Sequence, residues 1–190
     1  MTTRPARLSH VVLNSTNPSG LMNWYCNVLG GEMVFDSPFF SFMTYDDEHH
    51  RVAALLSSAD ASTKTPGTGL MHVAFGFDTI GDLLDHYGRL KADTVAPTTA
   101  VHHGPTISFY YKDPEGNVLE FFVDTMSAAE ATEFLKGPLY AQNPVGYEID
   151  PDDLVAQREG GQSDAEIMHF DTEREVDVMA TLMRQQELLA

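Results

Sequence analysis

An internal repeat constrains the fold of this chain more than any other feature of its sequence. The segments SHVVLNST, beginning at Ser9, and MHVAFGFD, beginning at Met71, align at an offset of 62 residues that places His10 on His72. A repeated unit of this size predicts two modules of the same topology that pack into one structure. The other matched pairs are Val11 with Val73, Leu21 with Leu83, Tyr25 with Tyr87 and Val28 with Leu90.

The first copy predicts the order βαβββ. An apolar β run at 8–14 precedes a helical pattern at 18–29. The helix has signals at both ends, because Asn17 stands at the N-cap, Pro18 takes the first helical position and Gly30 lies just past the last turn. Three strand-like runs follow, at Glu32–Asp36, Phe39–Tyr45 and Arg51–Ser57.

The second copy predicts the same order. A strand is expected at 70–77 and a helix at about 79–91. The turn Asp-Pro-Glu-Gly joins the last two strands of this copy. The three expected strands are Thr94–Ala96, Thr106–Lys112 and Asn117–Val123.

The repeat also predicts the domain organisation. We expect an α+β fold in which two βαβββ modules, 7–57 and 70–125, form a single domain over residues 1–125. The segment Ser57–Gly69 is rich in Ser, Thr, Gly and Pro and is expected to link the modules. Residues 126–190 are expected to form a helical and extended tail that packs on the domain or on a partner subunit.

Within the tail, residues 127–136 predict a short helix, and NPVGYEIDPDDL predicts an extended segment that starts another helix at Asp152 or Asp153. The last run mixes apolar and acidic residues at helical spacing, which fits a covering helix or a subunit contact. A long amphipathic tail on a chain of two modules leads us to expect a homo-oligomer. His169 in this run is interpreted as a surface residue.

Charge and composition exclude several classes of partner. The chain has 11 Lys and Arg residues against 28 Asp and Glu residues, so its net charge of -17 opposes binding to nucleic acid or to an anionic membrane surface. No apolar run is long enough to span a bilayer, and the start MTTRPARLSH has no signal-peptide core, so a cytoplasmic protein is expected. The single cysteine, Cys26, excludes an internal disulfide and a thiolate metal site.

Glu120 is an unusual residue because it interrupts the apolar run Val-Leu-Glu-Phe-Phe-Val. Burying a carboxylate is costly unless a cation or hydrogen-bond donors meet it. The period of two puts Glu120 on the face opposite the packed residues, with Tyr110 roughly opposite it across the hairpin. The expected packed face consists of Ile107, Phe109, Tyr111, Leu119, Phe121 and Val123, and the other face of Ser108, Tyr110, Glu120 and Phe122.

Two histidines at matching positions, His10 and His72, and the carboxylate of Glu120 favour a metal site. Two imidazoles and one carboxylate leave coordination positions open, which suits Fe(II) or Mn(II) used for chemistry better than a closed zinc site. Taken singly, each histidine fits a core residue with satisfied hydrogen bonds, and Glu120 fits an ion pair with an arginine. The repeat favours one metal site that accounts for all three residues together.

With these residues the sequence resembles the vicinal oxygen chelate superfamily and, within it, the single-domain type I extradiol dioxygenases that open catechols. The resemblance covers residues 7–125 and continues through GPLYAQNPVGYEIDPDDL. It implies a half-barrel around a metal site, with Fe(II), or Mn(II), bound by His10, His72 and Glu120. It also implies O2 as co-substrate, a small aromatic diol as substrate and a place in aromatic compound catabolism.

Two further motifs carry this resemblance. HHRVA matches a histidine pair whose second member, His50, is implied to act as acid and base beside O2. HG followed by SFYYKDPEGNVLE matches a pattern in which His103 and Tyr110 hydrogen-bond the substrate and ring-opening oxygens. DPEGN alone is weak, because it recurs throughout the superfamily. His102 is an alternative to His103, and His49 is expected to be an exposed strand-end residue.

The same superfamily leaves other functions open. Isomerases and lyases of the glyoxalase or epimerase type take a fourth ligand, Glu or Gln, from the last strand of the first module, but RVAALLS offers neither. Thiol transferases that inactivate an antibiotic use three ligands and have no evident need for His50, His103 and Tyr110. Metal-free sequestering proteins lack the ligand set. An aromatic-lined pocket of Phe39, Phe40, Phe42, Phe109 and Phe122 is possible, although packing explains these residues equally well.

Overall fold

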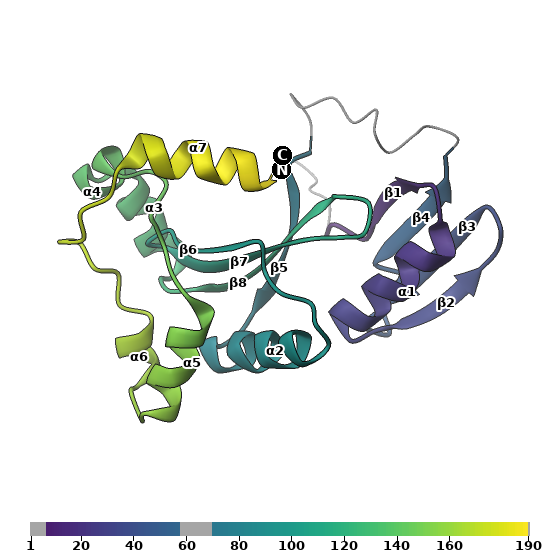
Figure 1. Cartoon of the computed structure of the whole chain (residues 1–190), viewed down its shortest axis with the longest axis horizontal. Helices are drawn as coiled ribbons and strands as arrows, with labels where there is room; N and C mark the ends of the chain where they lie inside the picture. Colours follow the sequence, from purple (N-terminus) through teal and green to yellow (C-terminus); the bar gives the residue numbers. More distant parts are fainter. Residues whose placement is uncertain (1–6, 58–69, 190) are drawn as a thin grey trace, which may run out of the picture. The chain divides into compact units, whose positions relative to one another are not determined.

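The computed structural model describes residues 7–57 and 70–189 (Figure 1). The chain divides into two compact units, each described here by itself. The first unit contains the N-terminal module together with the turn Asp113–Asn117. The second contains the described residues 70–112 and 118–189.

The first unit is a four-stranded mixed sheet with one helix, α1 (Pro18–Leu29). Asn17 caps this helix by accepting a hydrogen bond from the Gly20 N–H, and Gly30 ends it with a φ of 66°, as predicted. The sheet order is β1-β4-β3-β2, with β1 and β4 parallel and the remaining pairs antiparallel. The strands are β1 (Val11–Ser15), β2 (Glu32–Asp36), β3 (Phe40–Thr44) and β4 (Val52–Leu56).

The second unit repeats this topology around helix α2 (Ile80–Ala92). Its sheet order is β5-β8-β7-β6-β9, again with a parallel pair, β5 and β8, formed by the first and last strands of the module. The equal order of the two sheets confirms the repeat and the α+β fold. The module strands are β5 (His72–Phe77), β6 (Thr99–His102), β7 (Thr106–Lys112) and β8 (Val118–Asp124).

The strand expected at Thr94–Ala96 is wrong, because the chain there ends helix α2. Thr94 has a φ of 63°, and the N–H groups of Thr94 and Val95 donate to the carbonyls of Lys91 and Leu90 in the last helical turn. Pro97 then lacks an N–H for a sheet ladder. The strand begins at Thr99 instead.

The tail belongs to the second unit. Its strand β9 (Tyr147–Glu148) pairs antiparallel with β6, and helix α5 (Pro151–Glu159) is joined to α2 by the ion pair of Lys91 with Asp152 at 2.6 Å. Helix α5 begins before the expected Asp152 or Asp153, because Asp150 is the N-cap. The other tail helices are α3 (Ala128–Lys136), α4 (Pro138–Gln142), α6 (Asp164–Ile167) and α7 (Val178–Leu189). None of the helices within residues 7–57 and 70–189 has the length and apolar character to cross a membrane.

The β7–β8 hairpin has the predicted register. Tyr110 pairs directly with Glu120, and all six residues of the expected packed face are at most 2% exposed. The hairpin turn is held by Asp113, whose Oδ1 accepts hydrogen bonds from the N–H groups of Glu115 and Asn117. The turn is fastened within the first unit, where Glu115 Oε1 accepts a hydrogen bond from Ser15 Oγ at 2.9 Å.

Candidate metal and catalytic site

Glu120 is met by a histidine and a tyrosine. Its Oε2 lies 3.0 Å from Nε2 of His72, and its Oε1 lies 3.2 Å from the Tyr110 hydroxyl. The sheet produces both contacts, because β8 runs between β5, which begins with His72, and β7, which carries Tyr110 opposite Glu120. The carboxylate is therefore partnered without an arginine.

These contacts change the proton affinity of both partners. Burial by itself would raise the pKa of Glu120, but hydrogen bonds from His72, Ser108 and Tyr110 outweigh it and hold this pKa below its usual value. The hydrogen bond to Glu120 raises the pKa of His72. Both shifts follow from one interaction, which favours an ionised carboxylate at Glu120.

His103 extends this set of contacts. Its Nε2 lies 3.0 Å from the Tyr110 hydroxyl and its Nδ1 lies 3.0 Å from the carbonyl oxygen of Val145. A carbonyl only accepts hydrogen bonds, so the Nδ1 of His103 carries a proton. Burial lowers the pKa of His103, which favours the neutral ring with a bare Nε2.

His102 has different hydrogen-bond partners from the adjacent His103. It is 2% exposed, donates from Nε2 to the Met168 carbonyl at 3.1 Å and accepts at Nδ1 from the Gly104 N–H at 3.2 Å. His102 is the last residue of β6 and His103 is the next residue of the chain, yet the two side chains have different partners. Of the two, His103 is the one that contacts Tyr110.

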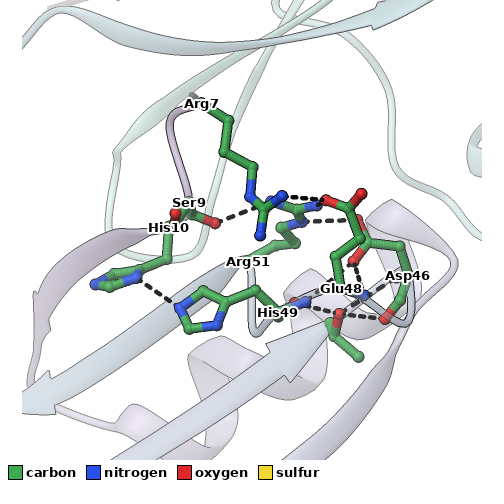
Figure 2. A network of polar contacts seen from close by, with 8 residues as sticks. Arg7, Ser9, His10, Asp46, Glu48, His49 and Arg51 are labelled. Atoms are coloured by element: carbon green, nitrogen blue, oxygen red, sulfur yellow. Dashed lines mark hydrogen bonds and ion pairs between the residues drawn. The ribbon is translucent and has the colours of Figure 1, made fainter. Parts of the chain in front are cut away.

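The first unit brings together three histidines at the start of its parallel strands. Figure 2 shows two of them, His10 and His49. His10 precedes β1, whereas His49 and His50 end the β3–β4 loop, and Val11 pairs with Val52 in the parallel register. His10 Nδ1 lies 3.1 Å from His49 Nε2, and the His50 ring lies 4.6 Å from the His10 ring between centroids. Burial, followed by the charges of His49 and His10, lowers the pKa of His50.

The predicted site residues therefore fall into two groups. His72, Glu120, Tyr110 and His103 form one connected set in the second unit. His10 and His50 lie near each other in the first unit. The first unit thus carries the predicted ligand His10 and the predicted acid–base group His50, and the second unit carries the other predicted site residues.

Sequence reasoning missed two participants. His49 was expected to be exposed, but it is half-buried and hydrogen-bonded to His10, so that expectation is wrong. The carbonyl of Val145 fixes His103, yet a main-chain acceptor leaves no residue-type signal in a sequence. The only hint was the Asn-Pro-Val-Gly segment, whose Gly146 adopts a φ of 75°.

The expected aromatic pocket is only partly possible. Phe109 is fully buried in the packed face of β7, so it cannot line a pocket. Phe39 and Phe40 are exposed, and Phe42 stacks on the His50 ring with 5.0 Å between centroids. Phe122 is half-buried on the Glu120 face of β8.

The ligand atoms of His72 and Glu120 fit a metal ion. Adjacent ligands about 2.1 Å from an octahedral ion lie about 3 Å apart, which matches the 3.0 Å between His72 Nε2 and Glu120 Oε2. The Nδ1 atom of His72 is buried and has no hydrogen-bond partner among the described residues. The donor set of imidazole and carboxylate suits Fe(II) or Mn(II).

A match to a known protein family shows where this chain belongs. The model of the Glyoxalase/Bleomycin resistance protein/Dioxygenase superfamily matches residues 7–121, which is most of both modules. The chain belongs to this superfamily.

Two relatives in this superfamily, both from Rhodococcus globerulus, match most of the chain. Biphenyl-2,3-diol 1,2-dioxygenase 2 is 42% identical over 80% of this chain and 80% of its own length. Biphenyl-2,3-diol 1,2-dioxygenase 3 is 37% identical over 88% of this chain and 89% of its own length. A solved lactoylglutathione lyase from Agrobacterium tumefaciens has a TM-score of 0.52 over 64% of this chain and 96% of its own, at 22% identity, and shares the superfamily fold.

The repeat within this superfamily chain identifies the first-module counterpart of Glu120. Glu120 pairs with Ala74 in the parallel register, and the equivalent pair in the first unit is Ala53 with Val12. Ala53 is buried and offers only a methyl group. Ala53 is therefore the position in β4 at which a fourth carboxylate or amide ligand would have to stand.

Proposed function

We propose that this chain is an extradiol ring-cleavage dioxygenase that opens a catechol-type diol with O2, using Fe(II). The observation that carries the proposal is the connected series of contacts His103–Tyr110–Glu120–His72, in which two side chains suited to acid–base work reach the carboxylate that we assign to the metal. The predicted enzyme class agrees with both Rhodococcus relatives, which are biphenyl-2,3-diol 1,2-dioxygenases.

We assign the metal ligands as His72, Glu120 and His10. The contact between His72 and Glu120 supports the first two, and His10 enters from the repeat, in which it matches His72. When bound, the ion supplies chelation of both diol oxygens and a route for electrons from the diol to O2. Fe(II) is preferred to Mn(II) on the resemblance of the sequence.

The protein side chains then have defined tasks for protons. When the His103 ring is neutral, its bare Nε2 at 3.0 Å and Glu120 Oε1 at 3.2 Å both compete for the Tyr110 hydroxyl proton. The hydroxyl has one proton, so it donates to only one of them at a time. A proton accepted at His103 Nε2 makes His103 a donor to the Tyr110 oxygen, so that Tyr110 donates to Glu120. His103 and Tyr110 can thus take up a diol proton and return it to a developing oxyanion.

His50 has the protonation state required of a base. Its pKa is lowered by burial and by His49 and His10, so the ring is neutral at pH 7 and free to accept a proton. We propose that it acts as the acid and base beside O2. Phe42, stacked on the His50 ring, restricts the orientation of the imidazole.

We also propose that the enzyme works as a homo-oligomer. The tail helix α7 leaves Met179 and Met183 64% and 58% exposed, which is apolar surface that a second subunit would cover. Sedimentation at micromolar concentration should show a species larger than the 21.0 kDa chain. A monomer would contradict this part of the proposal, and the cytoplasmic location stays a prediction from the sequence.

The deciding experiment is oxygen uptake by the iron-loaded protein. Catechol, 2,3-dihydroxybiphenyl, and bulkier and acidic catechols are supplied in turn, and O2 consumption is recorded together with the yellow ring-opened product. We expect uptake with at least one diol that matches product formation. The proposal fails if no diol in the panel drives O2 consumption by protein that retains stoichiometric iron.

A further inference from the structure

We propose that His10, His49 and His50 form a three-imidazole binding site for Zn(II) within the first unit, and that zinc bound there inhibits the enzyme. The binding site stands on the geometry of the first unit alone. The inhibition rests on the proposed function, because it requires His10 to be an iron ligand.

The distances between the three rings fit one small ion. One ligand nitrogen from each histidine can be chosen so that all three lie within 4.8 Å of one another. Nitrogens bound to a tetrahedral zinc ion at about 2.05 Å lie about 3.3 Å apart, and His10 Nδ1 is already 3.1 Å from His49 Nε2. The remaining spacings, at most 4.8 Å, must shorten by up to about 1.5 Å for all three nitrogens to bind one ion.

The contact of His10 with His49 is itself informative. Two imidazole nitrogens at 3.1 Å require one proton between them, because two bare lone pairs would repel. A metal ion that replaces this proton binds both nitrogens without moving either ring far. His10 is exposed, and His49 and His50 are half-buried, so an ion from solvent can reach the three rings.

Arg51 holds the backbone of this site in place (Figure 2). Its guanidinium donates to the Ser9 carbonyl at 3.1 Å, beside His10, and to Asp46 Oδ2 at 2.6 Å. Asp46 in turn accepts from the His49 N–H through Oδ1, at 3.4 Å. The two chain segments that carry the histidines are thus joined through one arginine before any metal binds.

The same network determines the ligand chemistry. Asp46 is paired with Arg51, and Glu48 is paired with Arg51 at 2.8 Å and with Arg7 at 3.5 Å. The nearby carboxylates are therefore engaged by arginines, which leaves nitrogen donors only. Imidazole ligands suit zinc and copper, and the Irving–Williams order places both above Fe(II) and Mn(II). The three histidines should select Zn(II) over the catalytic ion.

Occupancy by zinc has a direct consequence for turnover. The bound zinc ion would occupy the nitrogens of His10, the proposed iron ligand, and of His50, the proposed acid–base group. Zinc at this site and iron held by His10 are then mutually exclusive. His49 is neither a proposed iron ligand nor the proposed acid–base group, so its replacement removes one zinc ligand and leaves His10 and His50 in place.

Zinc binding is tested first, on the full-length His72→Ala/Glu120→Gln variant, in which two of the three proposed iron ligands are absent. Calorimetric titration with Zn(II) should show about one equivalent bound, and Co(II) should give the absorption bands of a nitrogen-ligated site. Adding His49→Asn should weaken zinc at least about 10-fold, whereas His169→Asn, an exposed control, should not. The site is refuted if zinc binding is absent from the double variant or is unchanged by His49→Asn.

Inhibition is tested on the iron-loaded protein with the best diol of the panel. Zn(II) should lower O2 uptake in the unmodified protein, whereas His49→Asn, compared with its own uptake without zinc, should need at least about 10-fold more zinc for the same fractional inhibition. Equal zinc sensitivity of the two proteins overturns the inhibition. If zinc binds as described but no diol drives O2 uptake, the site stands and the proposed function fails. If uptake is observed but His49→Asn leaves zinc binding unchanged, the function stands and the site fails.

Discussion

The carbonyl oxygen of Val145 accepts a hydrogen bond from His103 Nδ1 at 3.0 Å, so a tail residue sets the tautomer of a proposed catalytic side chain. The approach is possible because Gly146 has no side chain. A Cβ built there would lie 2.1 Å from the His102 carbonyl oxygen and 2.8 Å from the His103 Cα. The second module and the tail thus build this part of the site together.

Gly146→Ala should therefore reduce both stability and turnover. The φ of 75° and the contact with His102 should destabilise the fold by roughly 2–3 kcal/mol, and displacement of Val145 should lower kcat. Gly161→Ala is the matched control, since Gly161 has a φ of 85° and open space around its Cβ position. Urea unfolding and O2 uptake of the two variants separate the effects, and equal kcat values would contradict the role of Val145.

Glu120→Gln should abolish stoichiometric iron binding. The amide keeps the size of the side chain but removes the negative charge that holds the ion, and the free energy of unfolding should change by no more than about 2 kcal/mol. Iron content after anaerobic reconstitution is the measurement. Glu133→Gln on helix α3, where the carboxylate is 76% exposed, should retain iron. Full iron content and activity in Glu120→Gln would exclude Glu120 as a ligand.

Tyr110→Phe and Tyr111→Phe make a matched pair on adjacent residues of β7. Tyr110→Phe removes the hydroxyl between His103 and Glu120, so turnover should fall about 100-fold or more with iron retained. The Tyr111 hydroxyl is buried and has no hydrogen-bond partner in the described part of the chain. Tyr111→Phe should keep full activity and gain up to about 1 kcal/mol of stability. Similar activities in the two variants would remove Tyr110 from the mechanism.

His102 should make the fold sensitive to mild acid. Burial lowers its pKa to about 4, while an unfolded histidine has a pKa of 6.5. The unfolded chain therefore binds a proton first as pH falls, and stability present above pH 6.5 is lost progressively down to about pH 4, by about 3 kcal/mol.

Replacing His102 by Gln removes this titration and should flatten the curve of unfolding free energy against pH between 6.5 and 4. His86, whose pKa burial also lowers to about 4, contributes a similar slope that the variant keeps. Urea unfolding at a series of pH values gives both curves. Parallel curves for the two proteins would show that His102 does not titrate in this range.

Most of the fold was predictable because periodicity and repetition are properties of residue order. The alternation of residues in β7 and β8 predicts the pairing of Tyr110 with Glu120, which the register of the hairpin confirms. The Thr94–Ala96 error arose because a threonine with positive φ is uncommon, so a β-prone run was preferred to a helix end.

The candidate site was harder to predict than the fold. Residue types and spacing indicated His72 and Glu120, but which neighbour each side chain contacts depends on three-dimensional placement. His49 is the clearest case: the sequence HHRVA does not reveal that its ring contacts His10, which precedes the neighbouring strand β1. The carbonyl of Val145 is invisible for a different reason, since every residue has one.

Ala53, the counterpart of Glu120, is an amino acid whose codons can lie one base from those of glutamate. The codons GCA and GCG encode alanine, and changing their middle base to A gives GAA or GAG, which encode glutamate. If Ala53 is read from such a codon, one C-to-A transversion would give the first module its own carboxylate at the position that Glu120 holds in the second. A four-ligand site, which the resemblance associates with isomerases and lyases, would then be a single mutational step from this dioxygenase gene.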